Sequence, residues 1–352
     1  MRHFYFDIIF TIIALAIASW WGFSHGGTSA MFSALFITLI LAVMEISLSF
    51  DNAVVNASVL KHWDKFWKTI FLTVGILVAV FGMRLLFPIV IVALTADMSM
   101  TDVINMALNQ PKLYSEKLIA HHAEISAFGG MFLLLVFLNF IFDEQEVNWF
   151  GWLERNLARF GKIDAMSVFV ALFALMVSLT LVETDKKYAV LVAGVLGILV
   201  YLGTNVLSHI IEGADDDDDD TPELEGGAVA GAIVKGGIAG FLYLEVLDAS
   251  FSFDGVIGAF AITNDVIIIM LGLAIGAMFV RSLTLFLVEK GTLDEFVYLE
   301  HGAHYAIGAL AIIMLLSMKF HIPEIITGLI GVAFIVWAVI NSISYRKRHS
   351  TE

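Results

Sequence analysis

Two stretches of the chain place pairs of carboxylates inside otherwise apolar sequence. The first runs Glu45-Ile-Ser-Leu-Ser-Phe-Asp51-Asn52, and the second runs Asp248-Ala-Ser-Phe-Ser-Phe-Asp254-Gly255. Aligned without a gap, the two stretches have their carboxylates, both serines and one phenylalanine at the same positions. An acid in the middle of a lipid-length apolar segment costs about 2.5–3.5 kcal/mol on insertion scales, so such groups usually face a protein interior or a water-filled path. The four acids are therefore candidates for a buried site.

The residues around these acids offer oxygen ligands. On a regular helix Glu45 and Asp51 lie about 120° apart. Glu45 instead shares one helical face with the polar residues at i+4, i+7 and i+11, which are Ser49, Asn52 and Asn56. Hard divalent cations such as Mn²⁺, Mg²⁺ and Ca²⁺ prefer oxygen ligands, whereas Zn²⁺ and Cu usually recruit His or Cys. These residues predict a site for a hard cation, with a proton relay or a purely structural polar contact as the alternatives.

Three further charged residues lie in apolar segments. Arg84 and Arg281 would be costly unpaired, so we expect them to pair with the motif carboxylates and to balance their charge. The alternative is that their side chains reach the membrane surface. Glu245 lies one helical turn before Asp248 and is interpreted as an extra ligand or a proton-coupling group.

Histidines and a possible helix cap lie near the ends of apolar runs. His122 and His301 occupy such positions, where an interfacial or capping role is more typical than metal binding. Asp265, next to Asn264, is predicted to cap a helix.

The composition excludes several classes of protein. Hydrophobic residues make up 59% of the 352 residues, charged residues only 15%, and the mean hydropathy is +0.89. A soluble protein of this size cannot bury that much apolar surface, so the sequence indicates a polytopic membrane protein. Cysteine is absent, which excludes disulfides and thiolate metal sites. The net charge of −15 comes largely from loop acids, no basic patch indicates nucleic-acid binding, and no common catalytic motif indicates an enzyme.

Apolar runs of roughly 17–25 residues predict ten membrane-spanning helices. Two of these runs, 30–60 and 228–262, are longer than one straight span and carry the acids in their middle. We expect a kink or break in each, as in the discontinuous helices of transporters. The full set is 5–23, 30–60, 67–95, 123–142, 164–183, 188–211, 228–262, 265–289, 302–319 and 323–344.

An internal repeat relates the two parts of the chain. Besides the acidic stretches, Gly75 and Arg84 match Gly272 and Arg281, and the members of each pair are nine positions apart. Two more matches follow in the same order, His122–Gly129 with His301–Gly308 and Arg159–Asp164 with Lys319–Glu324.

Each half of the chain, 1–184 and 185–352, holds five predicted spans, and an odd number inserts the second half upside down. The predicted fold is thus an all-α membrane protein of two inverted five-helix repeats, with its site where the repeats meet near the midplane. Loop Lys and Arg, eleven against five, place both termini in the cytoplasm and the protein in the cytoplasmic (inner) membrane. The loop 212–227 is then cytoplasmic. Its run Asp215–Asp220 is interpreted as a solvated linker, with cation sensing or partner docking as alternatives.

The acidic stretches resemble those of the TerC family of membrane proteins, which includes Alx and belongs to the wider lysine-exporter superfamily. Glu45-x-x-Leu48-Ser49-x-Asp51-Asn52 is similar to the family pattern E-x-x-L-S-x-D-N, and Glu245-x-x-Asp248-x-x-Phe251-x-x-Asp254 to its second signature. The resemblance covers mainly 30–95 and 228–318. It implies an integral membrane protein of manganese export or tellurium resistance. By the same resemblance the metal path is lined by Glu45, Asp51, Asn52, Glu245, Asp248 and Asp254. Gly255 in place of serine, together with the additional spans, indicates a longer, divergent branch.

Together these features predict a divalent-metal exporter, with Mn²⁺ as the first candidate, that works by alternating access and is not an enzyme. Asp51 and Asp254, one from each half, are expected to lie close together as the principal ligands. Glu45 and Asp248 are expected to complete the site or carry protons. The expected partners are the transported cation and the lipid bilayer. The alternatives are a membrane-embedded assembly or metallation factor, which would dock through the acidic loop, and an amino-acid exporter.

Overall fold

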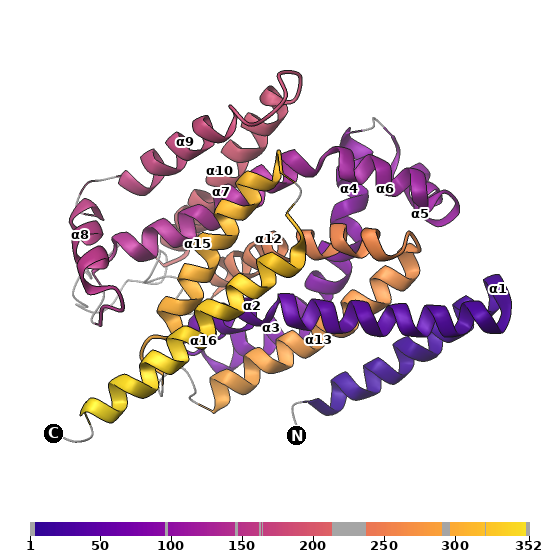
Figure 1. Cartoon of the computed structure of the whole chain (residues 1–352), viewed down its shortest axis with the longest axis horizontal. Coiled ribbons are helices and arrows are strands. Elements are labelled where there is room, and N and C mark those ends of the chain that lie inside the picture. Colours follow the sequence, from indigo (N-terminus) through magenta and orange to yellow (C-terminus); the bar gives the residue numbers. More distant parts are fainter. Residues whose placement is uncertain are drawn as a thin grey trace.

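The protein is described by a computed structural model that covers residues 4–95, 98–144, 147–161, 163, 165–212, 237–290, 296–320 and 322–349. Helices joined by short turns make up these ranges, and they contain no β-strand, which confirms the predicted all-helical fold (Figure 1). The acidic run Asp215–Asp220 lies outside the described residues, so its predicted roles stay predictions.

Most of the long helices overlap predicted apolar runs, whereas the shorter helices Met100–Asn109, Pro111–Ala120 and Gly151–Gly161 lie outside them. Asp64, Ser99 and Asp265 cap three of the helices by accepting hydrogen bonds from backbone N–H groups, and the predicted cap at Asp265 is confirmed. The bounds are α1 Tyr5–Leu48, α2 Phe50–Leu60, α3 Lys65–Leu77, the π-helix η2 Val78–Leu86, α4 Phe87–Thr95, α5 Met100–Asn109, α6 Pro111–Ala120, α7 His122–Phe142, α8 Gly151–Gly161, α9 Met166–Ser178, α10 Lys187–Glu212, α12 Ile238–Ile262, α13 Val266–Glu289, α15 Leu299–Ser317 and α16 Glu324–His349.

Among the described residues, seven helices are long and apolar enough to cross a membrane, or eight if the bent pair α8–α9 forms one span. The seven are Tyr5–Leu48, Lys65–Ala93, His122–Phe142, Lys187–Thr204, Val266–Glu289, Leu299–Ser317 and Ile326–Arg348. Helix α12 lies outside this set, and its 25 residues include three acids. Several apolar helices indicate a multi-pass membrane protein, and the count of ten spans stays a prediction.

Helix α1 folds back on itself at two glycines. Gly26 and Gly27 depart from helical geometry, and Gly27 has φ +71°, a region that favours glycine. Figure 1 shows the resulting turn at the end labelled α1. The two arms pack tightly, because a Cβ built on Gly22 would lie 2.6 Å from the Ala30 carbonyl oxygen and 2.8 Å from the Ala34 Cβ. The arms correspond to the first predicted run and the beginning of the second.

Two glycines bring the second arm of α1 against α13. A Cβ on Gly272 would lie 2.5 Å from the Leu41 Cβ, and one on Gly276 would lie 2.4 Å from the Glu45 Cβ. Glycines four residues apart let helix backbones approach closely in membranes. This packing places Glu45 directly beside the helix that carries Arg281.

The predicted helix breaks are only partly present. Ser49, with φ −100° and ψ 16°, separates α1 from α2 close to the predicted position. Hydrogen bonds continue across it, since the Ser49 N–H donates to the Glu45 carbonyl at 3.0 Å and the Ala53 N–H to the Ser49 carbonyl at 3.1 Å. In the second of the two long runs, 228–262, no break is present in the described part, because α12 runs without interruption from Ile238 to Ile262. Gly255 instead makes room for a neighbour: a Cβ there would lie 2.8 Å from Glu45 Oε2.

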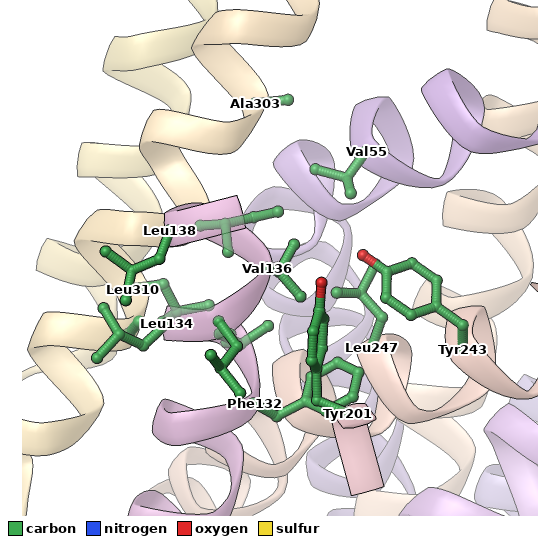
Figure 2. Close-up of a cluster of buried hydrophobic side chains, with 14 of the residues drawn as sticks. Val55, Phe132, Leu134, Val136, Leu138, Tyr201, Tyr243, Leu247, Ala303 and Leu310 are labelled. Carbon is green, nitrogen blue, oxygen red and sulfur yellow. The ribbon is translucent and has the colours of Figure 1, made fainter. Parts of the chain in front are cut away.

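The main apolar core lies where α7, α10, α12 and α15 meet. Figure 2 shows Phe132 of α7, Tyr201 of α10 and Tyr243 of α12 gathered together, and their rings are 5.6–6.4 Å apart. The Asn139 amide donates to the Tyr201 hydroxyl at 2.6 Å, which satisfies a polar group inside this core. This core fixes the position of α12, which carries the second acidic stretch.

Candidate functional site

In the first half, Glu45 and Arg84 form a buried ion pair. The Arg84 guanidinium donates through Nη2 to Glu45 Oε1, and both side chains are at most 3% exposed. The Ser49 hydroxyl donates to the same carboxylate oxygen at 3.1 Å. Arg84 lies in η2, and its Nη1 donates to the Ala79 carbonyl at 2.9 Å. π-helical turns occur often at functional sites, and the apolar run 67–95 gave no sign of this one.

In the second half, Arg281 pairs with two acids of α12. Its Nη2 lies 3.1 Å from Glu245 Oε1 and 3.5 Å from Asp248 Oδ2. Its Nη1 donates to the Phe71 carbonyl at 2.8 Å, and the guanidinium carbon lies 4.0 Å from the centre of the Phe71 ring. The predicted pairing of Arg84 and Arg281 with motif carboxylates is therefore present, and both arginines are buried rather than extended to the membrane surface.

Contacts between the two halves place both ion pairs beside helix α12, since a Cβ on Gly255 of that helix would lie 2.8 Å from Glu45 Oε2. The Asn52 amide donates to Asp248 Oδ1 at 2.6 Å. A Cβ on Gly75 would lie 2.4 Å from Arg281 Nη1 and 2.5 Å from Glu245 Oε1. Glycine at position 75 thus allows the first half to close over the second ion pair. Residues that are far apart in sequence therefore form one buried polar cluster.

Asp51 lies apart from both arginines. Its side chain is 7% exposed, and Oδ1 accepts the Asn52 N–H at 3.0 Å. Its Oδ2 lies against α16, where a Cβ on Gly331 would be only 2.7 Å away. Within the described ranges no Lys, Arg or His forms an ion pair with Asp51. Asp254 belongs to α12, but its side chain lies outside what the structure describes, so the predicted approach of Asp51 and Asp254 stays a prediction.

The cluster also holds polar atoms whose hydrogen-bonding capacity is unused. Each of the following is buried and has no hydrogen-bond partner among the described residues: Asn52 Oδ1, Asn56 Oδ1, Ser252 Oγ, Arg84 Nε and Arg281 Nε. Buried polar groups normally have partners, and two of these atoms, the oxygens of Asn52 and Asn56, lie one helical turn apart on α2. The oxygens among them match the ligand preference of hard cations.

The acids are arranged for charge balance with the arginines rather than as a ready metal cage. Within the part of the chain that the structure describes, no group of three or more His, Asp or Glu side chains is placed to hold a metal ion. Glu45, Glu245 and Asp248 each share oxygens with a guanidinium. A cation entering here must therefore displace an arginine or bind at oxygens that the arginines leave open.

The predicted histidines occupy different surroundings. His122 Nε2 lies 3.3 Å from the Ser126 hydroxyl near the beginning of α7. His301 is buried, and its Nε2 lies 3.8 Å from Glu154 Oε2. Glu154 also accepts the Trp149 N–H at 2.8 Å and the Tyr305 hydroxyl at 3.0 Å.

Two further acids, Glu154 and Asp7, are buried, and the sequence patterns did not predict their burial. Asp7 accepts the Ser282 hydroxyl at 3.0 Å. The signal for Asp7 was an acid within the first apolar run. The signal for Glu154 was its place one helical turn before Ala158 on a short amphipathic helix.

Comparison with known proteins gives a family without an assigned activity. No curated protein and no solved structure matches the chain. One family does match, described as "Protein of unknown function (DUF475)", over residues 50–349. The matched region begins just before Asp51 and includes both arginines and the whole second acidic stretch. It covers most of the sequence, and the chain therefore belongs to the DUF475 family of proteins of unknown function.

Proposed function

We propose that the protein exports a divalent cation, with Mn²⁺ as the first candidate, across the cytoplasmic membrane. The observation that carries this proposal is the buried network in which Asn52 of one half binds Asp248 of the other, between two arginine–carboxylate pairs. Buried charges are expensive in a membrane protein, and they commonly mark an ion or substrate path. Oxygen ligands alone, without Cys, favour a hard cation.

In this proposal the arginines neutralise the carboxylates while no cation is bound. A carboxylate buried without a partner is strongly disfavoured, so Arg84 holds Glu45, and Arg281 holds Glu245 and Asp248. Asp51 has no arginine partner among the described residues, and it is the first ligand that an entering cation contacts. The open oxygens of Asn52 and Asn56 lie on the same helix and extend the site along it. Binding of the cation then weakens the arginine contacts and permits the halves to rearrange.

The inverted repeat belongs to the same proposal, and one reciprocal packing pattern supports it. Gly75 of the first half packs against Glu245 and Arg281 of the second half. Its repeat partner Gly272 packs against Leu41 and Thr38 of the first half. Two repeats related by an axis in the membrane plane place their sites at such an interface. The resemblance to the TerC family motifs points to the same substrate class.

Ligand-dependent stability tests the cation proposal. The purified protein should gain thermal stability on addition of Mn²⁺, because a ligand that binds only the folded state raises stability by RT ln(1 + [L]/Kd). A concentration of 100 Kd corresponds to about 2.7 kcal/mol. Asp51→Asn should remove most of this gain without lowering the stability in the absence of metal, since none of the described Lys, Arg or His side chains forms an ion pair with Asp51. Asp102→Asn, an exposed acid at the start of α5, is the matched control. A gain of the same size in Asp51→Asn contradicts the assigned site.

A second candidate, an amino-acid exporter, is supported by the charges of the same cluster. A zwitterion needs a cationic group for its carboxylate and an anionic group for its ammonium, and Arg281 with Glu245 and Asp248 offers both signs in one buried cluster. Replacing Mn²⁺ by lysine in the stability measurement separates the two. Stabilisation by lysine and not by Mn²⁺ favours this second function.

A further inference from the structure

The short helix α8 has a position and composition that the transport proposal does not use. It follows α7, one of the apolar helices able to cross a membrane, and it meets α9 at an angle of 103°. Figure 1 shows it at the edge of the molecule, near the end of α7. Arg155 and Arg159 are both exposed. Exposed arginines are costly inside the hydrocarbon layer, so α8 fits the surface of the bilayer.

Contacts near both ends fix α8 against the ends of two apolar helices. Near its N-terminus, buried Glu154 accepts the hydroxyl of Tyr305 of α15 at 3.0 Å. At its C-terminus, a Cβ on Gly161 would lie 2.0 Å from the carbonyl oxygen of Phe142, the last residue of α7. The Phe140 and His304 rings stack at 3.8 Å, which shows that the end of α7 lies beside the beginning of α15. Helix α8 therefore lies across the end of α7 and the beginning of α15.

With its inner face held by these contacts, α8 presents a fixed outer face. The apolar side chains Trp152, Leu153 and Phe160 are 77%, 37% and 48% exposed. On a helix at 100° per residue, Trp152, Phe160 and Leu153 cover one side of this face, and Arg155 and Arg159 the adjoining side. A short helix with aromatic and leucine side chains next to basic ones is typical of helices that lie in the membrane interface.

We propose that α8 is an interfacial helix that binds anionic phospholipid head groups through Arg155 and Arg159 and inserts Trp152, Leu153 and Phe160 among the acyl chains. The occupant follows from charge complementarity. The loop Lys and Arg count assigns this end of the molecule to the cytoplasmic leaflet, which carries the anionic lipids and attracts basic segments next to the membrane. The helix would thereby fix the depth and tilt of α7 and α15 in the bilayer.

Spin labelling tests the insertion, and the absence of cysteine makes each introduced label unique. The full-length variants Phe160→Cys and Asp185→Cys are reconstituted in bilayers containing phosphatidylglycerol. The label at position 160 should be accessible to oxygen and protected from an aqueous nickel reagent, whereas the label at the exposed turn position 185 should react with nickel. Nickel accessibility at position 160 equal to that at 185 overturns the insertion. Protection from both reagents indicates a covering protein segment or a second copy and also overturns it.

Lipid retention tests the head-group contact. Native mass spectrometry would compare how much phosphatidylglycerol remains on the double variant Arg155→Gln/Arg159→Gln and on the control Lys112→Gln/Lys117→Gln, which removes two charges from α6. Basic residues near the surface each contribute about 1 kcal/mol to attraction by anionic lipid, so the loss of two should weaken lipid binding by the α8 variant roughly thirtyfold. Equal retention by the two variants overturns the head-group assignment, whatever the spin labels report.

Discussion

At the scale of single residues, the buried charges of this protein depend on each other. Glu45 and Arg84 are both almost completely buried, and the carboxylate also accepts the Ser49 hydroxyl. The net contribution of such a pair can be small, because removing two charges from water costs nearly as much as their attraction returns. Deleting one partner alone is costly, because the other charge remains buried without compensation.

Substitution of Arg84 tests this dependence. Arg84→Gln should destabilise the protein by about 3–5 kcal/mol, measured as a shift of the thermal or denaturant midpoint in detergent. The double variant Glu45→Gln/Arg84→Gln should recover part of that loss, because no uncompensated charge then remains. The partly exposed pair of Lys61 and Glu300, 3.7 Å apart, is the control, and Lys61→Gln should cost less than about 1 kcal/mol. An Arg84→Gln effect as small as the control contradicts a buried, mutually dependent pair.

At the scale of elements, glycines decide which helices can approach the acidic cluster. Gly276 of α13 touches Glu45, Gly75 of α3 touches Arg281, and Gly331 of α16 touches Asp51. Each glycine lies on a different helix from the charged group that it contacts. Without a side chain at these positions, neighbouring helices can close over charged groups that would otherwise face lipid.

Gly276 provides a test of this close packing. A Cβ at position 276 would lie 2.4 Å from the Glu45 Cβ and 3.1 Å from the Ala42 carbonyl oxygen, so backbone as well as side chain must move. Gly276→Ala should therefore destabilise the protein by about 1–3 kcal/mol and reduce metal-dependent stabilisation. Gly203→Ala in α10 is the control, because no atom lies within 4 Å of the added Cβ and the helix gains about 0.8–1 kcal/mol in propensity. Equal effects of the two substitutions would show that helix propensity, not packing, governs position 276.

At the scale of the whole molecule, the distribution of basic residues predicts how the chain is oriented in the membrane. Lys61, between α2 and α3, is predicted to lie on the side rich in Lys and Arg, and Lys186, before α10, on the opposite side. Because the fold is helical, and every apolar segment that crosses the membrane changes sides, these two positions report on the whole arrangement.

Cysteine accessibility in intact cells measures this orientation. A membrane-impermeant maleimide should label Lys186→Cys in intact cells and should label Lys61→Cys only after the membrane is opened. The unmodified chain, which lacks cysteine, provides the background. Labelling of Lys61→Cys from outside would reverse the predicted orientation, and with it the leaflet assigned to α8.

The sequence by itself determined the class of fold and most of the charged residues of the cluster. Apolar runs of membrane length produced helices, and the repeated acidic stretches pointed to Glu45, Asn52 and Asp248, which the fold brings together. The pairing of the arginines could also be expected, because a buried charge in an apolar segment needs a partner. These features depend on local composition and on electrostatic cost, both of which can be read along one chain.

Only the tertiary structure decided which partner each charged side chain has and which backbone conformation positions it. The sequence predicted a kink or break in the run 228–262, yet α12 continues unbroken past Gly255, and this glycine accommodates Glu45. The π-helix around Arg84 and the burial of Glu154 under α15 were not visible as patterns. The missing Cβ of a glycine permits either a turn or a close approach. Which of the two occurs depends on a neighbour that is distant in sequence, and the fold alone supplies that neighbour.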